Sequence, residues 1–213
     1  MGTIRRINEK YLGYMRTNRI DNNTACMATA VLWASRSKDP SSQVGAVFVN
    51  EQGRVFSIGY NGAPNNWPDE EFPWGRDTQE GKNINNTKYP YVIHAEMNGI
   101  INYMGDNRDF IDSTLFVTLF PCEQCAKFLA QRGVKKVIYL SDKYALKDEE
   151  FDEKYNYDAN VAAKRTLAET GVEVVSYDSI NPEHAEELRI SLMPDKGVEV
   201  IEGKKRVRKI DEH

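Results

Sequence analysis

The sequence predicts a three-layer α/β/α fold, in which helices cover both faces of a central mixed five-stranded sheet. Helix-like and strand-like patterns follow one another in the order α-β-β-α-β-α-β-α-β. An alternation of this kind places the strands in one sheet and the helices on its two faces. The length of 213 residues fits one domain of ordinary size with a short appendage.

The first part of the pattern is a helix, a hairpin and a long loop. Residues 23–37 repeat apolar side chains at helical spacing, which predicts an amphipathic helix. The apolar, β-branched runs 43–50 and 54–60 are separated by a short turn that ends in glycine, which predicts a hairpin. The stretch 62–90 is rich in Pro, Gly, Asn and acidic residues. A loop of this length inside a domain is usually functional or disordered.

Helices and strands alternate after this loop. We expect helices at 94–104, 122–133 and 161–170, and strands at 114–120, 135–140 and 172–177. These elements define one domain at 23–178, between an N-terminal extension (1–22) and a C-terminal appendage (179–213) that holds a short helix over 182–192 and a basic, alternating segment.

The composition is that of a globular protein with a small-molecule partner. Acidic residues exceed basic ones by 32 − 28 = 4, so the chain lacks the broad positive field of most nucleic-acid or membrane binders. No apolar run is long enough to span a bilayer, and residues 1–21 do not read as a secretory signal, so we expect a cytoplasmic location. The basic cluster at 204–209 is expected to be a solvated tail.

The most specific pattern is HAE, which begins at His94, followed after a strand by PCEQC, which carries Cys122 and Cys125. One imidazole and two thiolates at the starts of two predicted helices suit Zn²⁺, with the fourth tetrahedral position left for water. An open position predicts a catalytic metal. Glu96, two residues after His94, is close enough to exchange a proton with that water without being a ligand.

Each half of this pattern has another interpretation when taken alone. A CxxC motif at a helix start is also a redox motif, but redox chemistry leaves His94 and Glu96 unexplained. A closed structural zinc site needs a fourth Cys or His. The remaining candidates, Cys26, His184 and His213, lie in a predicted core helix and in the appendage. The two halves together therefore favour a catalytic zinc site.

The sequence around these motifs resembles the cytidine and deoxycytidylate deaminase family. The resemblance covers about residues 27–177 and is carried by RSKDPSSQVGAVFVN, GYNGAPNNWPDEEFPWGR, TKYPYVIHAEMN and LFPCEQCAKFLAQRGVKKVIYLSDKY. It implies a zinc-dependent hydrolase that converts dCMP and water to dUMP and ammonia, which supplies dUMP for thymidylate synthesis. It also implies regulation by dCTP and dTTP, with Mg²⁺ accompanying a triphosphate effector, and a homo-oligomer, which is a hexamer in the family.

The resemblance also assigns roles to single residues. His94, Cys122 and Cys125 match the zinc ligands, Glu96 matches the proton carrier, and Asn61, Ala95 and Asn98 match substrate-binding positions. Asn61 has the alternative of a turn residue, and Asn98 that of a polar link within a helix. The RSKDP segment and the loop 61–76 form a hypothetical effector pocket. The side chains suited to hold a phosphate or an effector are Arg36, Lys38, Arg76, Lys143 and Tyr144.

Two departures from the family pattern bear on the substrate. Gly99 stands inside a helix where alanine is common, at a cost of about 0.5 to 1 kcal/mol, a change that would relieve crowding. Asn66 and Trp67 make the turn after Asn61 bulkier, which leaves a modified cytosine, a triphosphate substrate or lost regulation as alternatives. A polynucleotide deaminase is a weaker alternative, because the net charge of the chain is negative. A non-catalytic nucleotide sensor is also weaker, because Glu96 is retained.

Overall fold

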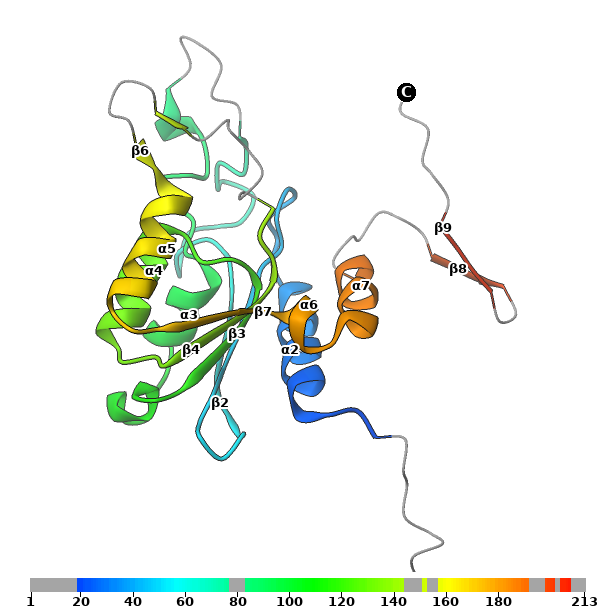
Figure 1. Cartoon of the computed structure of the whole chain (residues 1–213). Helices are drawn as coiled ribbons and strands as arrows, with labels where there is room; N and C mark the ends of the chain where they lie inside the picture. Colours follow the sequence, from blue (N-terminus) through cyan, green and yellow to red (C-terminus); the bar gives the residue numbers. More distant parts are fainter. Residues whose placement is uncertain are drawn as a thin grey trace, which may run out of the picture.

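The core of the molecule is the five-stranded mixed sheet that the order of elements predicts (Figure 1). The computed structural model describes residues 19–76, 83–143, 151–152, 157–191, 198–201 and 204–207. The strands of the sheet, in spatial order, are β2 (Val55–Tyr60), β1 (Gly45–Val49), β3 (Thr114–Leu119), β4 (Lys136–Ser141) and β7 (Glu173–Ser176). β1 runs antiparallel to β2 and β3, whereas β3, β4 and β7 are parallel. The predicted fold class is confirmed.

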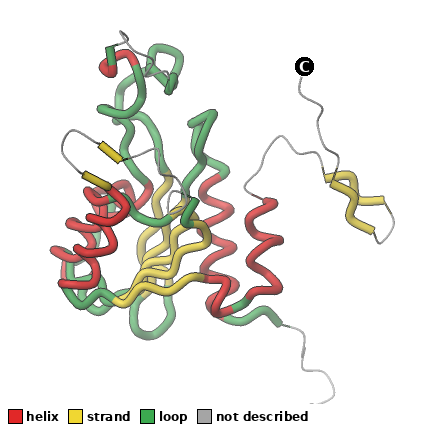
Figure 2. Tube along the Cα trace, turned by 45° about the horizontal axis from the view of Figure 1, so that its top comes forward, coloured by secondary structure: helices red, strands yellow, loops and turns green. Residues whose placement is uncertain are grey.

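Helices cover both faces of this sheet, as Figure 2 shows with the yellow strands between the red helices. One face carries α3 (Ala95–Ile101), α4 (Glu123–Gln131) and α5 (Ala159–Glu169), and the other carries α2 (Asn22–Ala34), α6 (Tyr177–Ile180) and α7 (Pro182–Ser191). The shorter elements are the 3₁₀ turns η1 (Ile84–Asn86) and η2 (Asn107–Phe110), and the hairpins β5 (Phe151–Asp152) with β6 (Tyr157–Asp158) and β8 (Val198–Ile201) with β9 (Lys204–Val207).

Strand β1 shows why the sheet needs helices on both sides. All five of its residues are buried, because successive side chains point to opposite faces and both faces are covered. Phe48 belongs to the core beneath α3, α4 and α5, whereas Val47 and Val49 belong to the core beneath α2 and α7. The two cores keep β1 and β3 rigid. The catalytic candidates are attached to the ends of these strands.

The beginning of the predicted appendage packs against the domain. In α7, Ala185 is fully buried in the core that α2 also lines. Arg189 donates to the carbonyl oxygen of Leu140 at 3.0 and 3.2 Å, which ties α7 to β4. Tyr177 Oη and Thr24 Oγ1 are 2.8 Å apart and join α6 to α2. The side chains of the basic cluster at 204–209 lie outside the described residues.

Asp21 caps helix α2, and its stabilising effect is expected to depend on pH. Its carboxylate accepts from the backbone N–H groups of Asn23 and Thr24 and from the Thr24 hydroxyl, and this hydroxyl contact in particular lowers the pKa of Asp21 below its usual 3.8. A lowered pKa adds stability above pH 3.8 that is lost as the pH falls through the folded-state value. We expect Asp21→Ala to lower the free energy of unfolding by about 1 kcal/mol at pH 7.

Urea unfolding between pH 7 and pH 3 tests this, with Asp21→Asn as the control, since asparagine caps equally well but does not titrate. The parent should lose its advantage over Asp21→Asn below pH 3.8. A difference between the two proteins that is constant with pH would contradict the expected role of the carboxylate.

Two glycines allow β2 and α3 to approach each other closely. A Cβ at Gly59 would lie 2.1 Å from the carbonyl oxygen of Ala95 and 2.5 Å from the amide nitrogen of Gly99, which is too close for any side chain. A Cβ at Gly99 would lie 2.7 Å from Cε2 of Phe48. The departure from alanine at position 99 thus coincides with real crowding, here against a core phenylalanine.

We expect Gly59→Ala to destabilise the protein by about 3 kcal/mol or more, because the clash is with backbone atoms that cannot rotate away. Displacement of α3 should also lower activity, since His94 and Glu96 lie at the start of this helix. Gly62→Ala is the matched control, because a Cβ there meets no atom within 4 Å. Equal melting temperatures for the two variants would refute the close-approach argument.

Candidate metal centre and active-site cavity

Two helix starts bring the predicted metal ligands together. His94 is the residue at the N-cap of α3, and Cys122 is the residue at the N-cap of α4, with Cys125 in the first turn of that helix. His94 is held near the end of β2 because Gly62 and Ile93 exchange two backbone hydrogen bonds, of 3.0 and 2.9 Å. The ligands are therefore attached to rigid parts of the fold.

The spacing of the ligand atoms suits a tetrahedral ion. The Nδ1 atom of His94 lies 3.3 Å from Sγ of Cys122 and 3.5 Å from Sγ of Cys125, and the ligand atoms of the three residues all lie within 4.8 Å of one another. Ligand atoms around a tetrahedral zinc ion are about 3.5 to 3.8 Å apart, given the usual Zn–S and Zn–N bond lengths. One nitrogen and two sulfurs at this spacing fit Zn²⁺ with one coordination position open.

Hydrogen bonds among the same three side chains shift the pKa of each of them. The pKa of Cys122 is lowered to about 4, first by its hydrogen bond with Cys125 and then by that with His94. The pKa of His94 is raised to about 9 by the hydrogen bond to Cys122. The Cys125 thiol has a pKa well above its usual value because of its hydrogen bond to Cys122 and its burial. Since metal ligands bind deprotonated, zinc binding must release protons from this cluster.

Glu96 is a buried carboxyl group two residues after the ligand candidate His94. It lies in the first turn of α3 and is only 4% exposed. Burial raises its pKa to about 7, against the opposing effect of the His94 charge. A carboxyl group whose pKa is near neutrality can both accept and return a proton at physiological pH, which is what a proton carrier requires.

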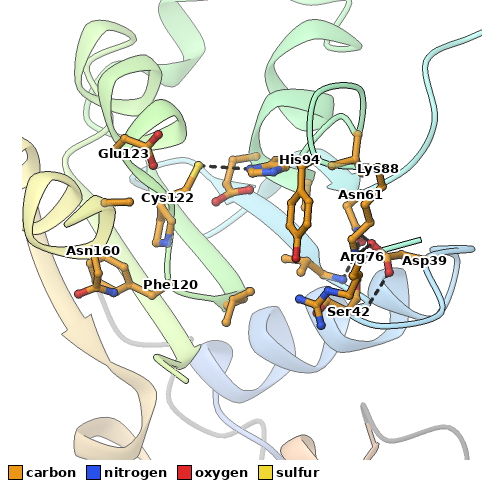
Figure 3. A pocket seen from close by; sticks show the side chains of 18 residues that line it. Asp39, Ser42, Asn61, Arg76, Lys88, His94, Phe120, Cys122, Glu123 and Asn160 are labelled. Atoms are coloured by element: carbon orange, nitrogen blue, oxygen red, sulfur yellow. Dashed lines mark hydrogen bonds and ion pairs between the residues drawn. The ribbon is translucent and has the colours of Figure 1, made fainter. Parts of the chain in front are cut away.

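Glu96 and two of the candidate metal ligands, His94 and Cys122, line a cavity of about 260 Å³ (Figure 3). The cavity is lined by Asp39, Ser42, Val44, Asn61, Arg76, Lys88, Tyr89, Val92, His94, Ala95, Glu96, Leu119, Phe120, Pro121, Cys122, Glu123, Ala159 and Asn160. Figure 3 shows Ser42, Arg76 and Asp39 on one side of the cavity, and Cys122 with Glu123 on the other. We call the side with Ser42, Arg76 and Asp39 the charged part of the cavity.

Asn61 lies in the wall of the cavity, and both hydrogens of its side-chain amide are donated to acceptors of the protein. Its Nδ2 atom donates to the carbonyl oxygen of Ser42 at 2.9 Å and to Oδ2 of Asp39 at 3.3 Å. Its Oδ1 atom accepts from the backbone N–H of Val44 at 2.8 Å. A carbonyl oxygen has two lone pairs, so the amide keeps capacity as an acceptor but not as a donor.

The other predicted substrate and phosphate positions divide into two groups. Ala95 and Arg76 line the cavity, and Lys143 donates to the hydroxyl of Ser42, which also lines it, at 2.9 Å. Asn98 instead donates to the carbonyl oxygen of Tyr60 at 2.5 Å, in keeping with the polar-link interpretation.

Three further predicted residues lie away from this wall or outside the description. Arg36 and Lys38 are exposed and do not line the cavity, and Lys38 forms an ion pair with Asp69 in the long loop. Tyr144 lies outside the described residues.

Sequence reasoning missed the buried pair of Asp39 and Lys88 in the cavity wall. Both residues lie inside the blocks RSKDP and KYPYV, which were identified only as signs of resemblance. Their spacing of 49 positions contains no local signal for contact. Only the fold brings them together.

Comparison with known proteins places the site in a family. Residues 20–141 match the model of the cytidine and deoxycytidylate deaminase zinc-binding region. The chain belongs to this family. The match contains His94, Glu96, Cys122 and Cys125. The zinc prediction is thereby confirmed, because the family region is a zinc-binding one and the three ligands are grouped as such an ion needs.

Individual relatives share much of the chain. The deoxycytidylate deaminases of Pongo abelii and Homo sapiens are 43% and 42% identical over 164 residues, which cover 76% of this chain and 89% of each relative. The solved structure of a dCMP deaminase from the cyanophage S-TIM5, in complex with dCMP and dUMP, is 28% identical, covers 76% of this chain and 98% of that chain, and has a TM-score of 0.51. Among the helices of the described ranges, none is long and apolar enough to cross a membrane.

Proposed function

We propose that this chain catalyses the hydrolytic deamination of dCMP to dUMP and ammonia, and so supplies dUMP for thymidylate synthesis. The observation that carries the proposal is the buried Glu96, which lines the same cavity as His94 and Cys122 of the cluster that Cys125 completes. The choice of dCMP is supported by the relatives named as deoxycytidylate deaminases and by the cyanophage enzyme bound to dCMP and dUMP.

The metal ligands and the carboxylate divide the chemistry. His94, Cys122 and Cys125 would hold a zinc ion, which when bound makes water a nucleophile at neutral pH. Water adds to C4 of cytosine, so that a C–O bond forms, and the bond from C4 to the exocyclic nitrogen then breaks to release ammonia. Glu96 takes a proton from the water and transfers it to N3. It then takes the remaining proton of the new C4 hydroxyl, which becomes the carbonyl of dUMP, and transfers it to the leaving amine. The number of protons balances, and Glu96 ends the cycle as it began.

Burial gives Glu96 this role. A carboxyl group on the surface would be ionised throughout the neutral range and would hold a proton only weakly. In the cavity the pKa of Glu96 is raised to about 7, so that proton uptake and release have similar driving forces. The short distance in sequence from His94 keeps the carboxylate beside the reacting centre without making it a ligand.

The polar part of the cavity suits the rest of the nucleotide. The free acceptor capacity of Asn61 fits a hydroxyl donor, and dCMP has only one free hydroxyl, at the 3′ position. Arg76 and the pair of Lys143 with Ser42 supply cations and a hydroxyl suited to the 5′-phosphate. Ala95 lines the cavity at the start of α3. Asn98 acts on the site indirectly, because its hydrogen bond to the Tyr60 carbonyl oxygen holds α3 against β2.

Regulation and assembly follow from the family resemblance. We propose dCTP as activator and dTTP as inhibitor, Mg²⁺ with the triphosphate, a homo-oligomer that couples the sites, and a cytoplasmic location. The ion pair of Lys38 with Asp69 supports the effector hypothesis, since it holds the RSKDP segment against the loop 62–76. dCMP saturation curves with and without each triphosphate, together with sedimentation of the protein, test these points.

The first experiment is ammonia release by the zinc-loaded protein. The substrates are dCMP, deoxycytidine, dCTP, 5-methyl-dCMP and a cytosine-containing single strand, with Glu96→Ala as the blank. Turnover of dCMP that is lost in the variant supports the proposal. Turnover confined to the single strand, or no turnover at all, would replace it with the polynucleotide or sensor alternative.

A further inference from the structure

A buried ion pair lies in the cavity wall on the side away from Cys122 (Figure 3). It joins the carboxylate of Asp39 to the ammonium of Lys88, and the two side chains are only 2% and 5% exposed. Neither group takes part in the chemistry proposed above. Burying two charges costs much of what their attraction returns, so such a pair is weak support for stability. Its place beside a binding cavity suggests a role in binding.

Asp39 uses its two oxygens for two different tasks. Oδ1 accepts from the backbone N–H groups of Ser41 and Ser42, at 2.8 and 3.1 Å, and so closes the turn that carries Ser42 into the cavity wall. Oδ2 accepts from Lys88 Nζ and from Asn61 Nδ2. One oxygen therefore shapes the turn, and the other holds the Asn61 amide.

Lys88 connects this arrangement to the segment that leads to His94. Its carbonyl oxygen accepts from the N–H groups of Tyr91 and Val92 at 3.0 and 2.9 Å, and its own N–H donates to Gly75 at 3.1 Å. The turn formed in this way ends one residue before Ile93, which pairs with Gly62. The ion pair thus joins the 39–42 turn, the end of β2 and the approach to the metal centre.

We propose that Asp39 and Lys88 are a positioning pair, which fixes the Asn61 amide so that its oxygen is presented to the sugar hydroxyl of the substrate. This inference rests on the proposed function. The amide can face the cavity with either its oxygen or its NH₂ group. Asp39 and the Ser42 carbonyl accept both amide hydrogens, and the N–H of Val44 donates to the amide oxygen, so these three contacts together select the orientation in which the oxygen keeps its remaining acceptor capacity. Lys88 holds the Asp39 carboxylate in place, because a buried charge needs a partner of opposite charge.

Asp39→Asn isolates this task. Its Oδ1 can still close the 39–42 turn, but an NH₂ group replaces Oδ2 and faces the donors of Asn61 and Lys88. We measure kcat and KM for dCMP and for 2′,3′-dideoxycytidine 5′-monophosphate, which lacks the hydroxyl. The parent should prefer dCMP in kcat/KM by tenfold or more. In Asp39→Asn the preference should fall below threefold, through a rise in KM for dCMP rather than a fall in kcat.

Asp106→Asn is the matched control, since the same substitution breaks an exposed ion pair with Arg108 outside the cavity wall, and the side chains of Arg108 and Asp106 are 83% and 47% exposed. It should keep the parental preference. A purely structural defect would lower the amount of active enzyme for both nucleotides alike and leave their ratio unchanged. If Asp39→Asn does not fold, the double variant Asp39→Asn with Lys88→Met, which also removes the buried ammonium, takes its place.

The outcomes separate the inference from the function on which it rests. A folded, zinc-loaded Asp39→Asn protein, or the double variant, that retains the parental preference overturns the inference. Equal efficiency of the parent on the two nucleotides also overturns it, while the deaminase function stands. A parent that deaminates neither nucleotide overturns the proposed function and the inference together.

Discussion

Glu96→Gln is expected to lower kcat for dCMP by about 10²- to 10⁴-fold, the usual contribution of a positioned acid or base. Glutamine has nearly the same shape as glutamate, so the packing of this 4% exposed side chain is kept while its ability to move a proton is lost. KM should change little, because the substitution removes an interaction that matters in the transition state rather than in ground-state binding.

Zinc analysis and melting curves decide whether this loss is chemical. The Glu96→Gln protein should bind as much zinc as the parent, since Glu96 is not among the three clustered ligands. Glu51→Gln, an exposed position in the turn between β1 and β2, is the control for the substitution itself and should retain full activity. Loss of zinc together with activity would show that Glu96 supports the metal site and would remove the argument for a proton carrier.

The zinc site could be predicted from the sequence because its signal is local. His94 with Glu96, and Cys122 with Cys125, are pairs whose spacing already places both members at a helix start. The strand between the two motifs then places both helix starts at the same end of that strand. Short-range patterns therefore determine both the ligand type and the arrangement of the ligands.

The charged part of the cavity could not be predicted in the same way. Asp39 and Lys88 meet across 49 positions, and a lysine or aspartate in a loop is usually exposed. Loop composition favoured Arg36 and Lys38, which the structure places outside the cavity wall. Burial of an ion pair depends on how three loops pack together, and no periodicity in the sequence reports that packing.

The fold shows the same division between local and long-range signals. The mixed five-stranded sheet and the helices on both faces follow from the alternating pattern, whereas the spatial order of the strands comes from the structure. The packing of α7 on the domain was not foreseen, since its composition is polar and, among the α7 residues whose burial is described, only Ala185 is fully buried. Its attachment depends on single contacts, such as Arg189 with the Leu140 carbonyl, which composition does not reveal.

Cys125→Ala is expected to abolish both zinc binding and deamination. Cys125 is 1% exposed and its Sγ lies 3.5 Å from Nδ1 of His94, so alanine at this position removes one of the three clustered ligand atoms. Two ligands, one of them an imidazole, hold zinc far more weakly than three. We therefore expect one zinc per chain in the parent and a small fraction of that in the variant.

The loss of zinc binding should also appear as a loss of the stability that a bound metal gives to the folded protein. A ligand present at 1,000 times its dissociation constant stabilises a folded protein by about 4.1 kcal/mol, so a chelator should lower the melting temperature of the parent. The same chelator should leave Cys125→Ala almost unchanged. Cys26→Ala is the matched control, because this cysteine is equally buried, at 3% exposed, but belongs to the core beneath α2. It should bind zinc, respond to the chelator and deaminate dCMP as the parent does.

The two cysteine variants together separate the ligand role from the packing role. If both lose activity and both keep zinc, burial rather than coordination explains the effect, and the His94, Cys122 and Cys125 cluster is not the metal site. If only Cys125→Ala loses zinc, the His94, Cys122 and Cys125 cluster is the metal site. The reaction then takes place in the cavity beside Glu96, since the described residues contain no other cluster that could hold a metal ion.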